Sequence, residues 1–327
     1  MAGLVSVMTL EVISRSVEPT KPGTFVPVLI LSITLDPEYR SVEDLLPDFA
    51  KKHPRSETDR LLEIDRWSLI RDDRKTMEIA TGYINGMGNV RTVLETSIYL
   101  ERVSPRYVFL CGIAGSLAPD HIGLGDVVIG KTVDWWNLNK LQPDQACKND
   151  PRYLQIGDSY FRKDITSFGE HSSGWHRRLG RFQNSNKERL PSNEGALLDL
   201  KSAITNSPNP RGNQIHYGKI ISWEYVLSHG HLRDELRRLT VDGLAIEMEA
   251  AGFCSSIKRR NEELEIQQKQ TNRAMGTKVE GFIFRGISDL SHKKGTEAEE
   301  WRKIAMSNAA SALVKFARTF TDTDFKN

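Results

Sequence analysis

The sequence has few cysteines, no long apolar run and no strong excess of either charge. Its three cysteines, Cys111, Cys147 and Cys254, are odd in number and far apart, so they suit neither a disulfide framework nor paired metal ligands. The longest apolar run, residues 26–33, is far too short to cross a membrane. We therefore expect reduced thiols and no membrane association.

The balance of charge excludes further classes of protein. A formal net charge of +2 over 327 residues is too small to attract the whole molecule to nucleic acid or to a membrane surface. Residues 12–21 are polar and show no signal-peptide pattern, which favours a cytoplasmic location. Histidine, cysteine and carboxylate residues lack ligand spacing, so we expect neither a metal nor an organic cofactor. What is present is an ordinary globular composition, 39% hydrophobic and 27% charged, sufficient to bury a full core.

Apolar segments with strand and helix periodicity alternate along most of the chain. Helices are predicted after Pro37, at 90–102 and at 298–319, and strands at 25–32, 76–84, 107–110, 125–130, 215–222, 244–247 and 279–285. Such alternation is typical of a sheet covered by helices on both faces. We predict one α/β domain over residues 25–320, with a mixed, mostly parallel twisted sheet. Residues 1–24 are predicted to form an arm and residues 321–327 a tail.

Two polar segments interrupt this pattern. Residues 140–214 contain 12 Lys and Arg against 8 Asp and Glu, and they read as an insertion in the domain. A structureless loop of that length is rare in a compact domain, so short helices are predicted near 150–163 and 174–182. Residues 258–278 are charged and rich in Gln, which predicts a helix extension followed by a solvated loop.

Three short motifs carry the chemistry, although they lie far apart in the chain. They are CGIAGSL at 111–117, AIEMEAAG at 245–252 and FRGISDL at 284–290. In each, an apolar strand runs into small or acidic residues. Ligands of open α/β sheets bind at the carboxyl ends of strands, so we expect the three motifs to meet there.

In this order the motifs resemble the nucleoside phosphorylase and nucleosidase superfamily. The resemblance is strongest to methylthioadenosine/S-adenosylhomocysteine nucleosidases and to the phosphorylase-like domains of immune-receptor and antiphage effectors. It extends from about residue 25 to about residue 316 and is broken by the insertion. It implies a nucleoside phosphorylase-like fold, cleavage of an N-ribosidic bond, and assembly as a homo-oligomer.

Two glycines are the informative residues of the first motif. Gly112 and Gly115 directly follow a strand, where a missing side chain permits either the close approach of a ligand or a tight turn without one. The resemblance implies that the backbone of Ala114 and Gly115 borders the ribose and the base.

The second motif brings two carboxylates to the end of a strand. Glu249 precedes small helix-forming residues, where the helix dipole favours a charged group that accepts hydrogen bonds from hydroxyls. The same position also suits a first-turn glutamate that serves only the dipole. The resemblance implies that Glu249 holds the ribose hydroxyls and that Met248 is an apolar wall under the sugar.

The third motif ends in Asp289, just past an apolar strand. Burial in a cleft would raise its pKa and suit it to general acid catalysis, whereas an isolated Ser-Asp pair is equally typical of a helix N-cap. The resemblance implies that Asp289 protonates the purine N7. Ser288 and Arg285 are expected to orient the loop, with Arg285 as an ion-pair partner for a nearby acid.

The turn after the first strand bears on the choice between hydrolysis and phosphorolysis. Its sequence is DPEYR, in which Glu38 aligns with the glutamate that activates water in the resembling nucleosidases, and Asp36 is the nearby alternative. Phosphorylases carry GDPxR here and an Arg before the glycine turn. This chain has Leu35 in place of that Gly, Arg40 one place too far along, and Leu110 before the turn. A phosphate site needs fixed cationic donors, so hydrolysis is favoured.

The base pocket is predicted to include Trp223, Tyr225 and Val226. The resembling proteins usually have Gly where this chain has Trp223, whose ring would narrow the pocket, stack on adenine or pack in the core. A phosphorylated 5′ end would need cations, for which Arg177 and Arg178 of the insertion are candidates. Their charge is equally consistent with plain surface.

Together these features predict a hydrolase that releases adenine from a nucleoside or nucleotide such as ATP, AMP or methylthioadenosine, with a role as a defence effector. Two alternatives remain at this point. One is a purine nucleoside phosphorylase, and the other is a non-catalytic module of the same fold that senses a nucleotide.

Overall fold

The computed structural model describes most of the domain and part of the insertion. The described residues are 25–33, 40–142, 153–156, 159–168, 178–179, 181–183, 214–228, 230–240, 242–271, 278–291 and 298–325. The predicted arm at 1–24 lies outside them. None of the described helices is long and apolar enough to cross a membrane.

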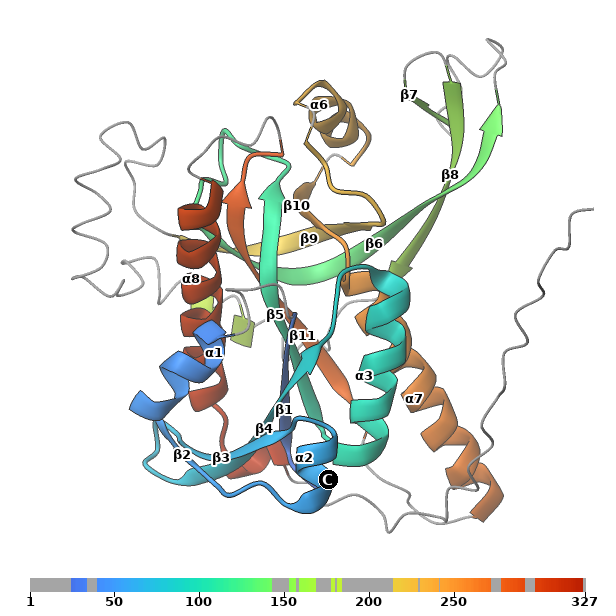
Figure 1. The fold of residues 1–327 in the computed structure, drawn as a ribbon. Coiled ribbons are helices and arrows are strands. Elements are labelled where there is room, and N and C mark those ends of the chain that lie inside the picture. Colours follow the sequence, from blue (N-terminus) through green and yellow to red (C-terminus); the bar gives the residue numbers. More distant parts are fainter. Residues whose placement is uncertain are drawn as a thin grey trace, which may run out of the picture.

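One twisted sheet runs through the described part of the molecule (Figure 1). Its order is β2 (Ala50–Lys52), β3 (Asp65–Ile70), β4 (Thr76–Ile84), β1 (Val28–Ile33), β5 (Tyr107–Ser116), β10 (Gly243–Glu247), β9 (Ile215–Trp223), β6 (Val127–Gln142), β8 (Ser159–Phe168) and β7 (Tyr153–Ile156). Strand β11 (Glu280–Asp289) pairs with both β5 and β6. The pairings β5–β10–β9–β6–β11 therefore return to β5 and close a ring of five strands.

The sheet is mixed, as predicted. Parallel pairs join β1 to β4 and β5, β5 to β11, and β9 to β10 and β6. The remaining pairs are antiparallel, including β5 with β10 and β6 with β11. The fold is thus an α/β domain whose central strands form both parallel and antiparallel pairs and whose outer strands pair antiparallel.

Helices cover both faces of the sheet because its central strands are apolar on both sides. Along β5, Phe109 and Cys111 pack toward α1 (Arg40–Leu45) and α8 (Ala298–Arg318), whereas Val108 and Leu110 pack toward α3 (Asn89–Val103) and α7 (Ala250–Thr271). This is the alternation that a period of two residues imposes on a strand. Figure 1 shows α1 and α8 on one side and α3 and α7 on the other.

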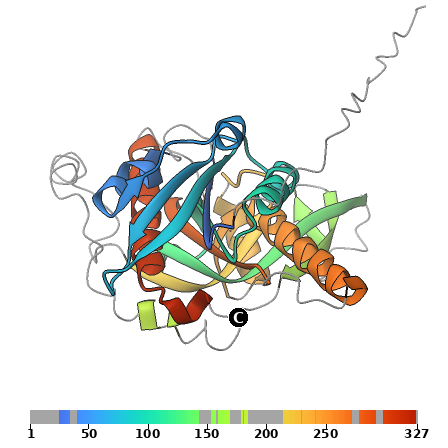
Figure 2. The same ribbon diagram turned by 90° about the horizontal axis from the view of Figure 1, so that it is seen from below.

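Most of the predicted elements are confirmed, several with shifted ends. Strand β4 and helices α3 and α8 lie where the periodicity places them, and β5 and β6 run further than predicted. The predicted helix extension is the second half of α7, which projects beyond the sheet in Figure 2. Elements that the sequence analysis missed are β2, β3, α2 (Glu57–Leu61) and α6 (Gly230–Leu239).

The prediction of a helix near 150–163 is wrong. Residues 153–156 and 159–168 are strands β7 and β8, which pair with each other and continue the sheet from β6. Residues 159–168 contain Tyr, Phe, Ile and Thr, which favour a pleated surface, and the open edge of β6 supplies backbone partners. Near 174–182, residues 178–179 and 181–183 are helical.

The segment predicted as a tail begins as an ordered element. Residues Asp322–Phe325 form the short helix η3, in which Phe325 packs on the core and the Asp324 carbonyl accepts a 2.6 Å hydrogen bond from the Tyr107 hydroxyl. Domain and C-terminal segment therefore form one folded unit up to residue 325.

Candidate active site

The site is built around Gly115, which pairs with a strand on each side. Ile246 of β10 is its partner on one edge and Asp289 of β11 its partner on the other. The three motifs therefore meet at one end of the sheet, as predicted.

A cavity of about 330 Å³ opens at this point. Its wall includes eight of the predicted residues, namely Ala114, Gly115, Tyr225, Val226, Met248, Glu249, Ser288 and Asp289. Ile33, Met87 and Ile113 add apolar surface, and Tyr225 lies at the rim with 60% of its surface exposed. The volume falls in the range of small-molecule pockets.

Glu249 is buried directly before the first residue of α7. Its Oε1 accepts a hydrogen bond from the Gly88 amide at 3.2 Å, and its Oε2 lies 3.4 Å from Nη2 of Arg285. These contacts fix the carboxylate at the pocket wall, where its position suits the predicted ribose contact.

Glu247, not Glu249, caps helix α7. Its Oε2 accepts hydrogen bonds from the amides of Glu249 at 3.0 Å and Ala250 at 2.8 Å. The same oxygen lies 2.5 Å from Nη2 of Arg285. Both carboxylates were noted in the sequence, but a role was predicted only for Glu249. Glu247, the first acid of Glu-x-Glu, lies just before the helix, where its side chain can accept from the first amides.

Arg285 is the buried cation that joins the two carboxylates. It is 0% exposed, and its predicted ion pair is confirmed by the contacts with Glu247 and Glu249. Gly112 makes room for it, because a Cβ at that position would lie 1.8 Å from Nη1 of Arg285. The first glycine of the turn therefore admits a guanidinium rather than a ligand.

Part of this ion-pair group has no partner. Within the described structure, Nε and Nη1 of Arg285 and Oε1 of Glu247 are buried without a hydrogen-bond partner. Buried polar groups of this kind are rare in proteins and are common where a ligand or water completes the arrangement. Glu247 also lines the cavity, so the group lies at its floor.

Asp289 is the last residue of β11 and is half-buried. Its Oδ1 accepts a hydrogen bond from the Ser291 amide at 2.9 Å, and its Oδ2 accepts one from the Ser288 hydroxyl at 3.2 Å. Helix α8 begins nine residues later, at Ala298, so Asp289 does not act as its N-cap. Its carboxylate belongs to the pocket.

Trp223 does not line the pocket, contrary to one of the predicted roles. Its side chain is 3% exposed and packs with Trp136, Leu227 and Ile246. It meets Tyr225 edge to face, with ring centroids 5.4 Å apart. Trp223 therefore packs in the core and supports Tyr225 from behind, which is one of the alternatives considered for it.

Asn89 was missed by the sequence analysis and ties three elements together behind Glu249. Its Oδ1 accepts hydrogen bonds from the Gly252 amide at 2.8 Å and the Ser222 hydroxyl at 3.1 Å, and its Nδ2 donates to Glu224 at 2.8 Å. A Cβ at Gly252 would lie 2.2 Å from the Asn89 carbonyl oxygen, so α3 and α7 touch through their backbones. The sequence feature that could have identified it was an Asn at the start of a predicted helix.

Arg302 was also missed. It lies in the second turn of α8 and lines the cavity. Among the described residues of the wall it is the single cation, and no ion pair of its guanidinium occurs within the described structure. Its signal in the sequence was weak, because one Arg near the charged start of a predicted helix is ordinary.

Four predicted residues lie elsewhere. Glu38, Asp36 and Arg177 are outside the described residues. Arg178 contacts Asp324 and Thr319, near Phe320, whose ring packs on Tyr107 at the far end of β5. Eight residues of β5 separate Tyr107 from Gly115, roughly 25 Å at about 3.3 Å per residue. Arg178 therefore does not reach this pocket, and its predicted contact with a substrate's 5′ end is not made here.

In the described segments, no group of three or more His, Cys, Asp and Glu side chains lies close enough together to hold a metal ion.

Fold and site together define a class of α/β protein with a glycine turn and two carboxylates at one sheet edge. Residues 79–256, more than half of the chain, match the model of the Phosphorylase superfamily. The chain belongs to this superfamily.

Two relatives illustrate the range of similar sequences. A Death domain-containing ATP nucleosidase of Amphimedon queenslandica is 21% identical over 226 residues, which cover 67% of this chain and 35% of that protein. A 5′-methylthioadenosine/S-adenosylhomocysteine nucleosidase of Listeria monocytogenes is 22% identical over 236 residues, covering 72% and 79%. The chain thus spans about a third of the first relative and most of the second.

Solved structures agree on the fold. The 5′-methylthioadenosine/S-adenosylhomocysteine nucleosidase of Helicobacter pylori has a TM-score of 0.55 at 15% identity, over 91% of this chain and all of that one. Futalosine hydrolase of the same organism has a TM-score of 0.52 at 16% identity, over 91% and 98%. At 15% and 16% identity, this similarity shows the fold alone.

Proposed function

We propose that the protein hydrolyses the N-ribosidic bond of an adenine nucleoside or nucleotide and releases the base. The observation that carries this proposal is that Asp289 and Glu249 line one pocket from the two strands that flank Gly115. Asp289 ends β11, and Glu249 follows the end of β10. Nucleosidases among the similar proteins support it. An acid on one side and a hydroxyl acceptor on the other are what cleavage of a ribosyl bond requires.

In the proposed reaction, Asp289 gives its proton to N7 of the purine while the bond between N9 and C1′ breaks. The electron pair of that bond leaves with the base. Glu249 accepts hydrogen bonds from the ribose hydroxyls, and Met248 lies under the sugar. The charge of Glu249 stabilises the positive charge that develops on the ribosyl group. Water then adds to C1′, with Glu38 proposed as the base that takes its proton.

Hydrolysis is proposed over phosphorolysis for a structural reason. Leu110, on the strand before the glycine turn, is fully buried in the core, so that position offers no donor to a phosphate ion. Arg285 is already paired with Glu247 and Glu249. Phosphate recognition in proteins depends on fixed cationic or backbone donors.

The test is base release in scrupulously phosphate-free buffer. Purified protein is incubated with adenosine, methylthioadenosine, AMP, ATP, inosine and guanosine, and chromatography identifies the free base. We expect adenine and a ribose product without added phosphate. Turnover that requires phosphate and yields ribose 1-phosphate would contradict the proposal, and nucleotide binding without any base release would favour the sensing alternative.

We propose further that the substrate carries an anionic 5′ group and that Arg302 contacts it, in place of the Arg178 of the sequence-based prediction. The support is Arg302, a cation on the pocket wall whose planar guanidinium suits a phosphate group. The homo-oligomer and the role as a defence effector remain predictions that follow from the resemblance. The cytoplasmic location remains a prediction from the polar residues 12–21.

A further inference from the structure

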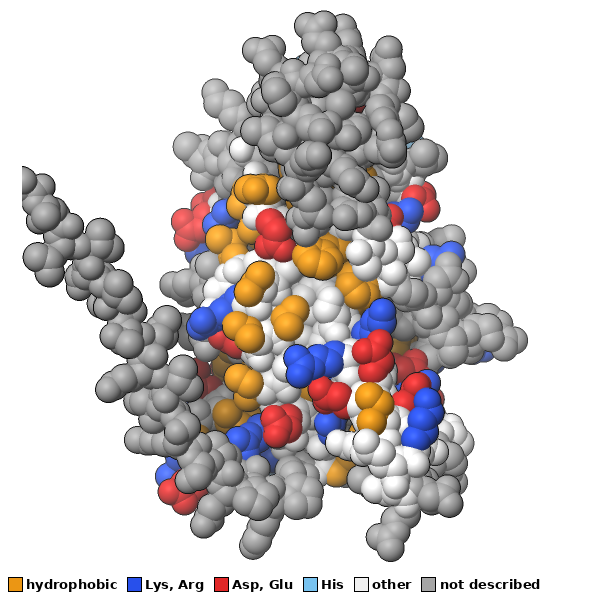
Figure 3. Space-filling model, turned by 90° about the vertical axis from the view of Figure 1, so that its right-hand side faces the viewer, with side chains coloured by type: hydrophobic (Ala, Val, Ile, Leu, Met, Phe, Trp, Pro, Cys, Tyr) orange, Lys and Arg blue, Asp and Glu red, His pale blue; other side chains and the backbone are white. Residues whose placement is uncertain are grey.

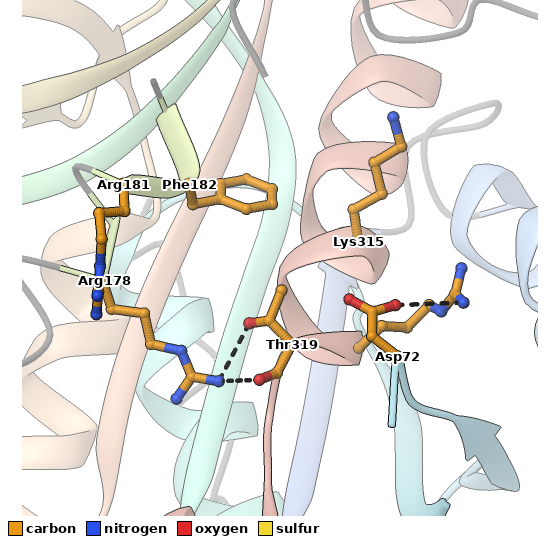
Figure 4. A pocket seen from close by; sticks show the side chains of 7 residues that line it. Asp72, Arg178, Arg181, Phe182, Lys315 and Thr319 are labelled. Carbon is orange, nitrogen blue, oxygen red and sulfur yellow. Dashed lines mark hydrogen bonds and ion pairs between the residues drawn. The ribbon is translucent and has the colours of Figure 1, made fainter. Parts of the chain in front are cut away.

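A second cavity lies at the opposite end of the sheet from the catalytic pocket. Its volume is about 430 Å³, and its wall combines the last turn of α8, the turn between β3 and β4, and Arg178, Arg181 and Phe182 of the insertion. Figure 4 shows its labelled side chains arranged around the end of α8. We call it the basic cavity, because its charged wall residues are Arg178, Arg181, Lys315, Arg318 and the single acid Asp72.

Arg178 forms a fixed wall of the basic cavity. Its Nη1 donates to Asp324 at 2.8 Å and its Nη2 to the Thr319 hydroxyl at 3.1 Å. The guanidinium also lies 4.7 Å from the ring centre of Phe320. The charge of Arg178 is thus balanced, and its orientation is set before any ligand arrives.

Arg318 is held in the same way on the other side. Its Nε donates to the Ile70 carbonyl at 3.0 Å, and its Nη2 forms an ion pair with Asp72 at 3.3 Å. The ring of Phe49 lies 4.8 Å below the guanidinium. An arginine has five N–H donors, so this one keeps donors for a further acceptor.

Lys315 differs from both arginines because its charge is not balanced. In the described part of the chain no acidic side chain forms an ion pair with it, and burial lowers the pKa of its ammonium group. It lies one helical turn before Arg318, so the two side chains extend from the same face of α8.

The helix dipole explains only part of this arrangement. Cations in the last turn of a helix are favoured by its dipole, which accounts for a basic end of α8. It does not account for Arg178 and Arg181, which reach the same cavity from the insertion. Two segments far apart in sequence therefore bring positive charge to one open cavity, with the apolar ring of Phe182 beside it.

We propose that the basic cavity binds a small phosphate-bearing molecule, with Lys315 and Arg318 contacting the phosphate and Phe182 packing against its organic part. The volume suits a ligand of this size, and the preoriented guanidinium groups suit phosphate oxygens. This site is separate from the catalytic pocket and does not depend on the proposed reaction.

Calorimetric titration with inorganic pyrophosphate at low ionic strength tests the phosphate contacts directly. We expect the wild-type protein to bind it and Lys315→Met to bind about tenfold or more weakly, because a charge-assisted hydrogen bond is lost. Lys315→Arg, which keeps the charge, should retain binding. Lys303→Met is the matched control, since Lys303 lies on the outer face of the same helix and pairs with Glu299.

Two further outcomes would overturn the proposal. Absence of pyrophosphate binding to the folded wild-type protein is one, and equal binding by wild type and Lys315→Met is the other. Arg302→Met serves to locate the ligand: if it abolishes binding while Lys315→Met does not, pyrophosphate occupies the catalytic pocket instead. Thermal denaturation of each variant shows that a loss of binding is not a loss of folding.

Discussion

Asp289 is the residue on which the proposed chemistry depends most. Replacing it with Asn keeps the size and one acceptor oxygen for the Ser291 amide, and its NH2 group can donate to the Ser288 hydroxyl, but the acid is removed. General acid catalysis is worth about 10²–10⁴-fold, so we expect kcat for base release to fall by that factor while binding persists. Steady-state kinetics and calorimetry on a folded Asp289→Asn protein measure the two effects.

Glu249→Ala provides the contrast to this variant. Glu249 is proposed to contact the ribose both before and during bond cleavage, so its loss should raise KM and lower kcat together. If Asp289→Asn instead released base at a rate near that of the wild type, Asp289 would serve only the turn at Ser291.

Arg302 bears on the choice of substrate. Arg302→Met should lower kcat/KM for AMP and ATP by about 10- to 100-fold, because one charge-assisted hydrogen bond is lost, and should change it less than about threefold for adenosine and methylthioadenosine. Lys303→Met, one residue further on the outer face, should affect neither group. Equal losses for charged and neutral substrates would remove Arg302 from the 5′ end.

At the scale of elements, the contact between α3 and α7 positions the ribose side of the pocket. Asn89→Ala leaves the Gly252 amide and the Ser222 hydroxyl without their acceptor, which should lower the free energy of unfolding by about 1–3 kcal/mol. Because Glu249 immediately precedes α7, we also expect a higher KM with a smaller change in kcat. Denaturant unfolding and steady-state kinetics measure the two effects.

The control for this variant is Asn85→Ala, an exposed asparagine in the loop before the same helix. It should leave both the unfolding free energy and KM nearly unchanged. If Asn89→Ala changed neither the free energy of unfolding nor KM, packing through Gly252 alone would be sufficient to hold α3 against α7.

The elements also show how far sequence reasoning extends. The first and fourth strands and the last helix were predictable, because burial on both faces or on one helical stripe leaves a strong period in the sequence. Glu249 and Asp289 were found for a related reason, since each directly ends a buried strand. Residues 153–156 and 159–163 were misassigned as helix because edge strands that continue the sheet from β6 depend on backbone partners outside their own segment.

Some site residues lacked any local signal. Whether Trp223 faces a ligand or the core depends on what packs against the other side of β9, which no short pattern encodes. Arg302 reaches the pocket only because α8 folds back over β11. The pairing of Arg285 with Glu247 was partly foreseeable from two acids in one motif, but the role of Gly112 in admitting the guanidinium was not.

At the scale of the whole molecule, one face is unusually apolar. Helix α3 presents Val90, Leu94 and Ile98 to solvent at intervals of four residues, on the face shown in Figure 3. The row continues through exposed Met87 to the rim of the pocket at Tyr225. If the chain forms the predicted homo-oligomer, this row is the surface that we expect a second copy to cover.

Light scattering on a size-exclusion column tests this expectation. The wild-type protein should elute with a mass that is a multiple of 37.0 kDa, and Leu94→Glu should shift it toward the single-chain mass. Ile266→Glu, on the exposed far part of α7, should have no effect. A monomeric wild-type protein would contradict the prediction.

The double pairing of Gly115 has a mechanical consequence. Asp289 and the strand that leads to Glu249 are attached to opposite edges of the same residue by backbone hydrogen bonds, so their separation is set by the width of the sheet rather than by flexible side chains. Changing that distance would require breaking paired strands inside a closed ring.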